Sequence, residues 1–201
     1  VGSEMCIRDR NKSLFKEYPM FTFTSFADPA PYPPLKTERP NPEYAAQMLA
    51  NAASCSSEMT AVSMYLYDSV VLSENAAEIS HIFKKMAVVE MHHLDIFLNL
   101  AFLLGADPRL WSQSGSRPCY WSPACSRYLC KTVPILENSL RSEQDTILQY
   151  RSQACQIRDA YIADLLNRII LDEQIHVQIL KELLERESCR AANPCRYMPE
   201  P

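Results

Sequence analysis

Two short stretches of the sequence place a glutamate three residues before a histidine. Glu90 precedes His93 within Ala-Val-Val-Glu-Met-His-His-Leu, and Glu173 precedes His176 within Ile-Ile-Leu-Asp-Glu-Gln-Ile-His-Val. Residues three apart share one face of a helix, so each pair would present a carboxylate and an imidazole to the same point. Because both stretches are largely apolar, we expect these polar groups to be buried, and buried charge requires a partner.

A further glutamate stands about one helix length upstream of each pair. Glu58 lies 32 residues before Glu90, and Glu143 lies 30 residues before Glu173. Glu137 competes with Glu143 for this role, but Glu143 better repeats the spacing of the first half. We therefore expect a carboxylate helix followed by a Glu-x-x-His helix, twice in the chain.

This donor set suits a pair of divalent metal ions. Carboxylate oxygens and imidazole nitrogens are ligands for iron and manganese alike, and four carboxylates balance the charge of two divalent ions. Without metal, the same carboxylates would repel one another and would be desolvated at a cost in stability. The predicted metal ligands are Glu58, Glu90, His93, Glu143, Glu173 and His176.

Two tyrosines stand at matching places in the two halves. Tyr65 follows Glu58 by seven residues, and Tyr150 follows Glu143 by seven, which puts each tyrosine two turns along the same helix face. They could donate hydrogen bonds or carry redox equivalents near the metals, or they could be core tyrosines with satisfied hydroxyls. His92 points about 100° away from the predicted ligands and is expected at the surface or just outside the site.

Proline spacing locates the helices that must carry these residues. Seven of the 14 prolines fall in the first 42 residues, whereas residues 43–107 and 135–193 contain none. Because proline breaks helix interiors, each of these blocks can hold a helical hairpin. The fold class is therefore all-α, a four-helix bundle of two helical hairpins joined by a long crossover loop. The expected elements are a helix over about 42–72, a turn at 73–75 with an Asn75/Glu78 capping box, a helix ending at Gly105, a crossover at 106–133, a helix from Pro134, and a last helix capped by Asp159.

The two ends of the chain lie outside this bundle. Residues 1–10 share no pattern with the remainder and resemble a translated adapter more than a natural protein start. Residues 11–41 are rich in proline, and we expect an extended arm that lies on the bundle or on a neighbouring subunit. The bundle is assigned to 42–187, and 188–201 is expected to be a loosely docked tail.

Charge and cysteine content narrow the functional classes. A net charge of −4 and a pI near 5.6 provide no basic patch, so we expect neither nucleic acid nor a membrane as partner. We expect a cytoplasmic protein whose eight cysteines are reduced. Cys55, one turn before Glu58, is interpreted as small core filler. Cys119, Cys125 and Cys130 have atypical spacing, so an ordered loop is favoured over a metal or redox site.

Three stretches also carry a resemblance to known proteins: Ser-Glu-Met-Thr-Ala at 57–61, Val-Glu-Met-His-His-Leu at 89–94 and Ile-Ile-Leu-Asp-Glu-Gln-Ile-His at 169–176. They resemble the ferritin-like superfamily, especially its bacterial manganese-catalase-like and rubrerythrin-like members, over about residues 31–187. The resemblance implies the same ligand set and gives Glu173 a proton-handling role, although its counterpart binds metal in many di-iron relatives. Thr146 stands where rubrerythrins carry a further carboxylate, which favours the catalase-like side.

The resemblance implies a peroxide-detoxifying oxidoreductase. With two manganese ions it would convert hydrogen peroxide to dioxygen and water; with two iron ions and an electron donor it would be a rubrerythrin-like peroxidase. A second interpretation is a spore-coat component with little activity, in which the arm and the cysteine-rich ends assemble with other coat proteins. Iron storage is a third and weaker interpretation. Such bundles commonly associate, so we expect a homo-oligomer.

Overall fold

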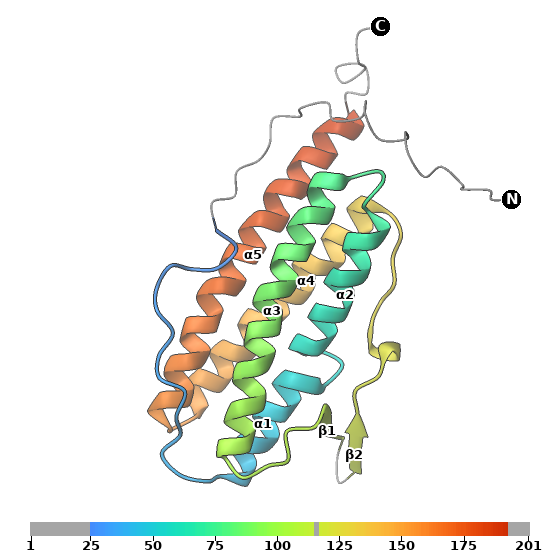
Figure 1. Ribbon diagram of the computed structural model, residues 1–201. Helices are drawn as coiled ribbons and strands as arrows, with labels where there is room; N and C mark the ends of the chain where they lie inside the picture. The colour runs from blue at the N-terminus through green and yellow to red at the C-terminus, as the bar shows by residue number, and fades with distance from the viewer. Residues whose placement is uncertain (1–24, 115–116, 193–201) are drawn as a thin grey trace, which may run out of the picture.

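The computed structural model describes residues 25–114 and 117–192, and in this part of the chain five α-helices form a bundle with a small β-hairpin at one end (Figure 1). The helices pack as two hairpins, one of α1 and α2 against α3 and the other of α4 against α5. This arrangement confirms the predicted all-α bundle of two hairpins and a crossover. The elements are α1 (Pro42–Ala53), α2 (Glu58–Val71), α3 (Ala77–Leu103), β1 (Trp111–Ser114), β2 (Arg117–Tyr120), the 3-10 turn η1 (Pro123–Cys125), α4 (Thr132–Gln156) and α5 (Ala160–Ala192).

The single helix predicted over 42–72 is wrong in one respect, because the chain breaks between α1 and α2. The break falls at Ser54-Cys55-Ser56-Ser57, where serine side chains hydrogen-bond to the backbone in place of the helix. Ser57 Oγ donates to the Ser54 carbonyl at 2.6 Å, and Ser54 Oγ donates to the Ser56 carbonyl at 3.0 Å. Glu58 therefore becomes the first residue of α2.

The predicted capping box of Asn75 and Glu78 does not form. α3 begins after Ala76, which caps it without a side-chain hydrogen bond, so Glu78 lies one position too early for the box. Glu78 instead accepts a hydrogen bond from Arg186 at 2.9 Å. At the other end, Gly105 adopts φ 98, the left-handed conformation that suits glycine after a helix.

Asp159 caps the last helix as predicted. Its Oδ1 accepts hydrogen bonds from the backbone of Tyr161 at 3.1 Å and Ile162 at 3.4 Å. α5 then continues to Ala192, beyond residue 187 where the bundle was expected to end. Residues 1–10, 11–24 and 193–201, which carry the rest of the expected tail and arm, lie outside the described residues.

The apolar core consists of two clusters with a polar layer between them. On α3 the first cluster includes Ile79 to Ala87 and the second begins at Ile96, so Glu90 and His93 fall between them. On α5 the clusters end at Ile170 and resume at Ile179, which leaves Glu173 and His176 in the same gap. The bundle thus surrounds its charged residues with apolar side chains at both ends.

The arm, residues 25–41, runs without helix or strand along the outside of α5 (blue in Figure 1). Arg168 of α5 donates from Nε to the Ala30 carbonyl at 2.8 Å and from Nη2 to the Asp28 carbonyl at 2.7 Å. Its guanidinium lies 4.1 Å from the ring centre of Tyr32. Near the far end of the arm, the Glu38 backbone donates to Asp159 at 2.7 Å. The arm therefore lies on the bundle of its own chain.

The crossover contains the antiparallel hairpin of β1 and β2, in which Trp111 pairs with Tyr120, and then the turn η1. The crossover is tied to α2 by a hydrogen bond from Trp121 Nε1 to Thr60 Oγ1 at 2.9 Å, and to the break before α2 by a disulfide between Cys55 and Cys125. The prediction of reduced thiols is wrong for these two cysteines, and Cys55 is exposed rather than core filler.

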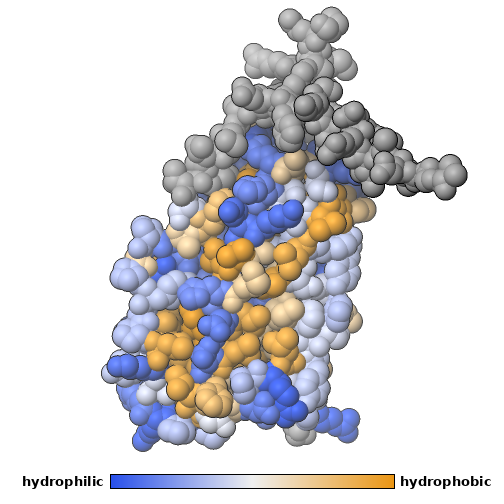
Figure 2. Space-filling view, in the orientation of Figure 1, coloured by the Kyte–Doolittle hydropathy of each residue, from blue (hydrophilic) through white to orange (hydrophobic). Residues whose placement is uncertain are grey.

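α3 is apolar beyond the part that faces the core. It is the one helix of the described residues long and apolar enough to cross a membrane, and 44% of its most apolar window is buried inside the bundle. Exposed apolar side chains on α3 include Val88, Met91 and Phe102, and apolar patches are visible on the surface in Figure 2. A helix at the centre of a bundle passes the same test, and this one carries buried Glu90 and His93.

Candidate metal centre

The structure brings all six predicted ligands into one buried layer. Two groups of side chains have potential ligand atoms within 4.8 Å of one another, and both groups contain Glu90 and Glu173. Glu58 and His93 complete the first group, and Glu143 and His176 complete the second. None of the six is more than 3% exposed. Glu137, the alternative to Glu143, is exposed on α4, and His92 is exposed on α3.

Each histidine turns Nδ1 toward the shared carboxylates. His93 Nδ1 lies 3.1 Å from Glu173 Oε1, 3.3 Å from Glu90 Oε2 and 3.9 Å from Glu58 Oε2. His176 Nδ1 lies 2.8 Å from Glu90 Oε1, 3.2 Å from Glu173 Oε2 and 3.8 Å from Glu143 Oε1. The two halves therefore have the same local geometry, with Glu90 and Glu173 placed between two positions that a cation could occupy.

Two of these oxygens fit a metal better than a hydrogen bond. Within the described part of the chain, Glu90 Oε1 and Glu173 Oε1 are buried and accept no well-directed hydrogen bond, although an imidazole Nδ1 lies 2.8 Å and 3.1 Å away. A nitrogen and an oxygen that approach closely without a hydrogen bond between them can both face a shared cation. Oxygen and nitrogen donors of this kind suit manganese or iron.

The two tyrosines link the hairpins reciprocally. The Tyr65 hydroxyl donates to Glu143 Oε1, and the Tyr150 hydroxyl donates to Glu58 Oε1. Each tyrosine thus holds the glutamate that belongs to the other hairpin, and both rings are 1% exposed. Both hydroxyls have a hydrogen-bond partner, as expected of core tyrosines, and in each case the partner is a predicted metal ligand.

The outward nitrogens of both histidines are held by groups that sequence reasoning missed. His93 Nε2 donates to Asp172 Oδ2 at 3.2 Å, and His176 Nε2 donates to the carbonyl of Phe26 in the arm at 3.0 Å. A carbonyl and a carboxylate can only accept, so Nε2 of each ring carries a hydrogen, and a cation that displaced the Nδ1 hydrogen would meet the Nδ1 lone pair on the side of the glutamates. Outer hydrogen bonds of this type orient metal-binding histidines.

Asp172 receives hydrogen bonds from four donors. Oδ1 accepts from the Asp28 backbone at 2.6 Å and from Arg168 Nη1 at 2.7 Å, while Oδ2 accepts from the Tyr32 hydroxyl and from His93. Burial opposes the charged carboxylate, but the hydrogen bonds from His93, Tyr32 and Arg168 outweigh it and lower the pKa of Asp172 to about 2. In the sequence, the place of Asp172 beside Glu173 in an apolar run could have indicated its role. The carbonyl of Phe26 could not have been found in this way, because every residue has a backbone carbonyl.

Without a cation, protons balance the buried charge. Burial, followed by repulsion from Glu90 and Glu173, raises the pKa of Glu58 well above its usual value, and the pKa of Glu143 rises for the same reasons. Burial lowers the pKa of His176, but attraction to Glu90 and hydrogen bonds to Glu173 and Glu90 together outweigh burial and raise this pKa to about 10. Metal binding would displace protons from the same atoms.

A polar cavity of about 210 Å³ connects this layer with the surface. The buried carboxylates of Glu58, Glu90 and Glu143 line it, as do the exposed side chains of Arg127 and Arg141. It opens between α2, α4 and the crossover, so a small polar molecule can reach the carboxylates from this side.

The fold and the paired Glu-x-x-His helices together define an all-α four-helix bundle with a buried carboxylate and histidine site that could hold two metals. Two crystal structures of KatB, a manganese catalase from Anabaena, share this fold at 18% sequence identity. The first matches with a TM-score of 0.68 over 82% of this chain and 81% of the KatB chain. The second matches with a TM-score of 0.69 over 88% of this chain and 86% of the KatB chain. No family model and no curated protein matches the sequence.

Proposed function

We propose that the protein is a manganese-dependent catalase that converts two molecules of hydrogen peroxide to one of dioxygen and two of water. The observation that carries the proposal is the pair of shared carboxylates, Glu90 and Glu173, set between two inward-facing imidazoles in a bundle with the fold of a manganese catalase. His93 with Glu58 would hold one ion, and His176 with Glu143 would hold the other. Two bound manganese ions would supply the two-electron redox chemistry.

The residues of the chain would supply binding and proton handling. The cavity admits peroxide to the side of the site lined by Glu58, Glu90 and Glu143. Glu173, which belongs to both groups of ligand atoms, would take a proton from peroxide at the oxygen that is not bound to a cation and return it to the departing water. Tyr65 and Tyr150 hold Glu143 and Glu58 in place by hydrogen bonds, and the apolar clusters on both sides limit entry of water.

The test is metal analysis joined to oxygen release. Protein from a manganese-supplemented host should contain two manganese per chain and release dioxygen from peroxide. Glu143→Gln should lose most of both, whereas Glu137→Gln, an exposed glutamate on the same helix, should keep them. Two irons per chain with peroxide consumed only when a reductant is present would favour the rubrerythrin-like peroxidase, and absence of bound metal would refute the site.

A further inference from the structure

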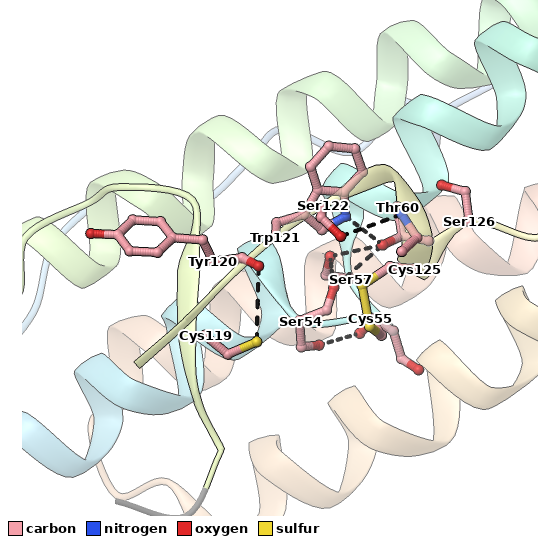
Figure 3. Close-up of a disulfide and its surroundings, with 12 residues drawn as sticks. Ser54, Cys55, Ser57, Thr60, Cys119, Tyr120, Trp121, Ser122, Cys125 and Ser126 are labelled. Atoms are coloured by element: carbon pink, nitrogen blue, oxygen red, sulfur yellow. Dashed lines mark hydrogen bonds between the residues drawn. A yellow bond between two sulfur atoms is a disulfide. The ribbon is translucent and has the colours of Figure 1, made fainter. Parts of the chain in front are cut away.

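The disulfide between Cys55 and Cys125 lies at the cavity that leads to the candidate metal centre. Cys55 stands in the break between α1 and α2, and Cys125 ends the turn η1 in the crossover, 70 residues further along the chain (Figure 3). Both cysteines line the same cavity as Glu58 and Glu90. Cys55 is exposed and Cys125 is half-buried, so small oxidants and reductants can reach the pair from solvent.

The bond joins the crossover to the segment that positions Glu58. Cys55 precedes Glu58 by three residues, and the hydroxyl of Ser57, the last residue of the break, bonds back to Ser54 rather than capping the helix. The start of α2 therefore depends on this serine-rich break. A covalent link at Cys55 restrains the break and, with it, the first turn that carries the Glu58 carboxylate.

The other contacts recorded between the crossover and α2 in the described residues are neutral. Trp121 Nε1 donates to Thr60 at 2.9 Å, the hydroxyls of Ser126 and Ser63 approach to 3.4 Å, and the rings of Tyr67 and Tyr128 meet edge to face with their centres 4.7 Å apart. Neutral hydrogen bonds at a partly exposed junction contribute little net stability each, because water competes for the same groups. Reduction of the disulfide should therefore loosen the crossover over the cavity.

We propose that Cys55 and Cys125 are a redox modification site that responds to hydrogen peroxide and tightens the wall of the cavity at Glu58. Arg127 and Arg141 line the cavity with the cysteines, as do the carboxylates of Glu58, Glu90, Glu143 and Asp145, so peroxide on its way to the buried layer passes the pair. One thiolate attacks peroxide and, with one proton taken from solvent, gives a sulfenic acid and water. The second thiol displaces that oxygen as water and forms the disulfide, so peroxide is reduced by two electrons.

The reverse step needs an external dithiol. A dithiol reductant attacks the exposed disulfide, forms its own disulfide and leaves Cys55 and Cys125 as thiols, with two electrons and two protons transferred. The couple would thus hold the site closed while peroxide is abundant and loosen it under reducing conditions. The link to metal retention rests on the proposed function, but the thiol chemistry and the loosening do not.

The first experiment uses metal-free protein, so that no metal-dependent reaction consumes the peroxide. Protein reduced with dithiothreitol and desalted is titrated with hydrogen peroxide, and the Cys55–Cys125 peptide is followed by mass spectrometry. Tryptic cleavage after the exposed Arg127, two residues past Cys125, is timed in both forms. We expect the disulfide to form and cleavage after Arg127 to slow on oxidation, while cleavage after Arg158, in the loop between α4 and α5, stays unchanged.

The second experiment measures manganese release to a chelator from loaded protein. Release should be roughly tenfold faster after reduction, at the lower end of the effect of removing a supporting contact around a metal site. A Cys55→Ser/Cys125→Ser double variant should behave like the reduced protein whatever its redox treatment. Cys119→Ser, which alters another exposed cysteine of the crossover, should respond like the unchanged chain.

The outcomes separate this inference from the proposed function. Disulfide formation with slower cleavage after Arg127, in a protein that releases no dioxygen, would retain the switch and refute the catalase. If no manganese binds, the cleavage result alone decides. Equal cleavage and equal manganese release in the two redox forms, or peroxide sensitivity that persists in the double variant, would overturn the switch.

Discussion

Asp172→Asn should remove one of the two metal positions and spare the other. In the native protein, each oxygen of Asp172 accepts from two donors. The asparagine amide replaces one oxygen with a donor, which must then face other donors. The Oδ1 position faces Arg168 and a backbone N–H, which can never accept. The amide nitrogen will therefore take the Oδ2 position, opposite Tyr32 and His93.

The amide then forces a change at His93. The Tyr32 hydroxyl can rotate to accept, but His93 can accept at Nε2 only by moving its hydrogen to Nδ1. Nδ1 is the atom that faces Glu90 and Glu173 at 3.3 Å and 3.1 Å, so a metal ion at this position would lose its nitrogen ligand. Loss of an outer partner typically weakens metal binding about 10- to 100-fold, or roughly 1.4 to 2.7 kcal/mol.

The other position is an internal control, because His176 is held by the Phe26 carbonyl, which the substitution does not change. Metal analysis after dialysis against a graded series of chelator concentrations should show one tightly held ion per chain in Asp172→Asn and two in the unchanged protein. Circular dichroism would check that the variant remains helical. Equal weakening of both ions, or no weakening of either, would refute the tautomer argument.

Three further predictions concern stability. Tyr150→Phe leaves Glu58 without its hydroxyl donor, and thermal unfolding should report a loss of about 1 to 3 kcal/mol, whereas unchanged stability would mean that the bond contributes nothing. Asp68, buried on α2, has a pKa raised by burial from 3.8 to about 7, so the folded state favours the acid and its stability falls as pH rises between these values. Asp68→Asn should therefore stabilise the protein at pH 8 by at most about 4 kcal/mol and have little effect at pH 4; equal effects at both would contradict the raised pKa. Metal-free protein should lose stability as pH rises from about 5, because burial and neighbouring carboxylates raise the pKa values of Glu58 and Glu143. Denaturant titrations should show that metal loading removes this dependence of the unfolding free energy on pH. An unchanged dependence would argue against metal at these carboxylates.

The sequence predicted the bundle and the gathering of the six polar side chains because both depend on periodicity along single helices. Two Glu-x-x-His pairs in apolar runs leave few ways to bury their charge, and the repeated spacing selected Glu143, which is buried, over Glu137, which is exposed. The apolar spacing of residues 42–72 continues across Ser54–Ser57, so the sequence did not reveal the helix break there. It depends on serine hydroxyls bonding to the backbone.

Contacts between distant segments were beyond sequence reasoning. Asp172 meets Asp28 across 144 residues, and the Cys55–Cys125 bond spans 70. No local pattern reports such pairings in a single sequence. The expectation of reduced thiols rested on compartment alone, and it was wrong for the pair because fold geometry brings their Cα atoms to 4.7 Å.

The exchange of tyrosine and glutamate between the hairpins has a consequence for assembly. Tyr65 and Glu58 lie on one hairpin, but each finds its hydrogen-bond partner on the other, in Glu143 and Tyr150. Neither hairpin can complete a metal position alone, and each leaves its carboxylates in water until the other covers them. Docking of the hairpins and burial of the four glutamates are therefore one event. Metal that arrives with docking neutralises the charge as it is buried; metal that arrives later must first displace the protons that took its place.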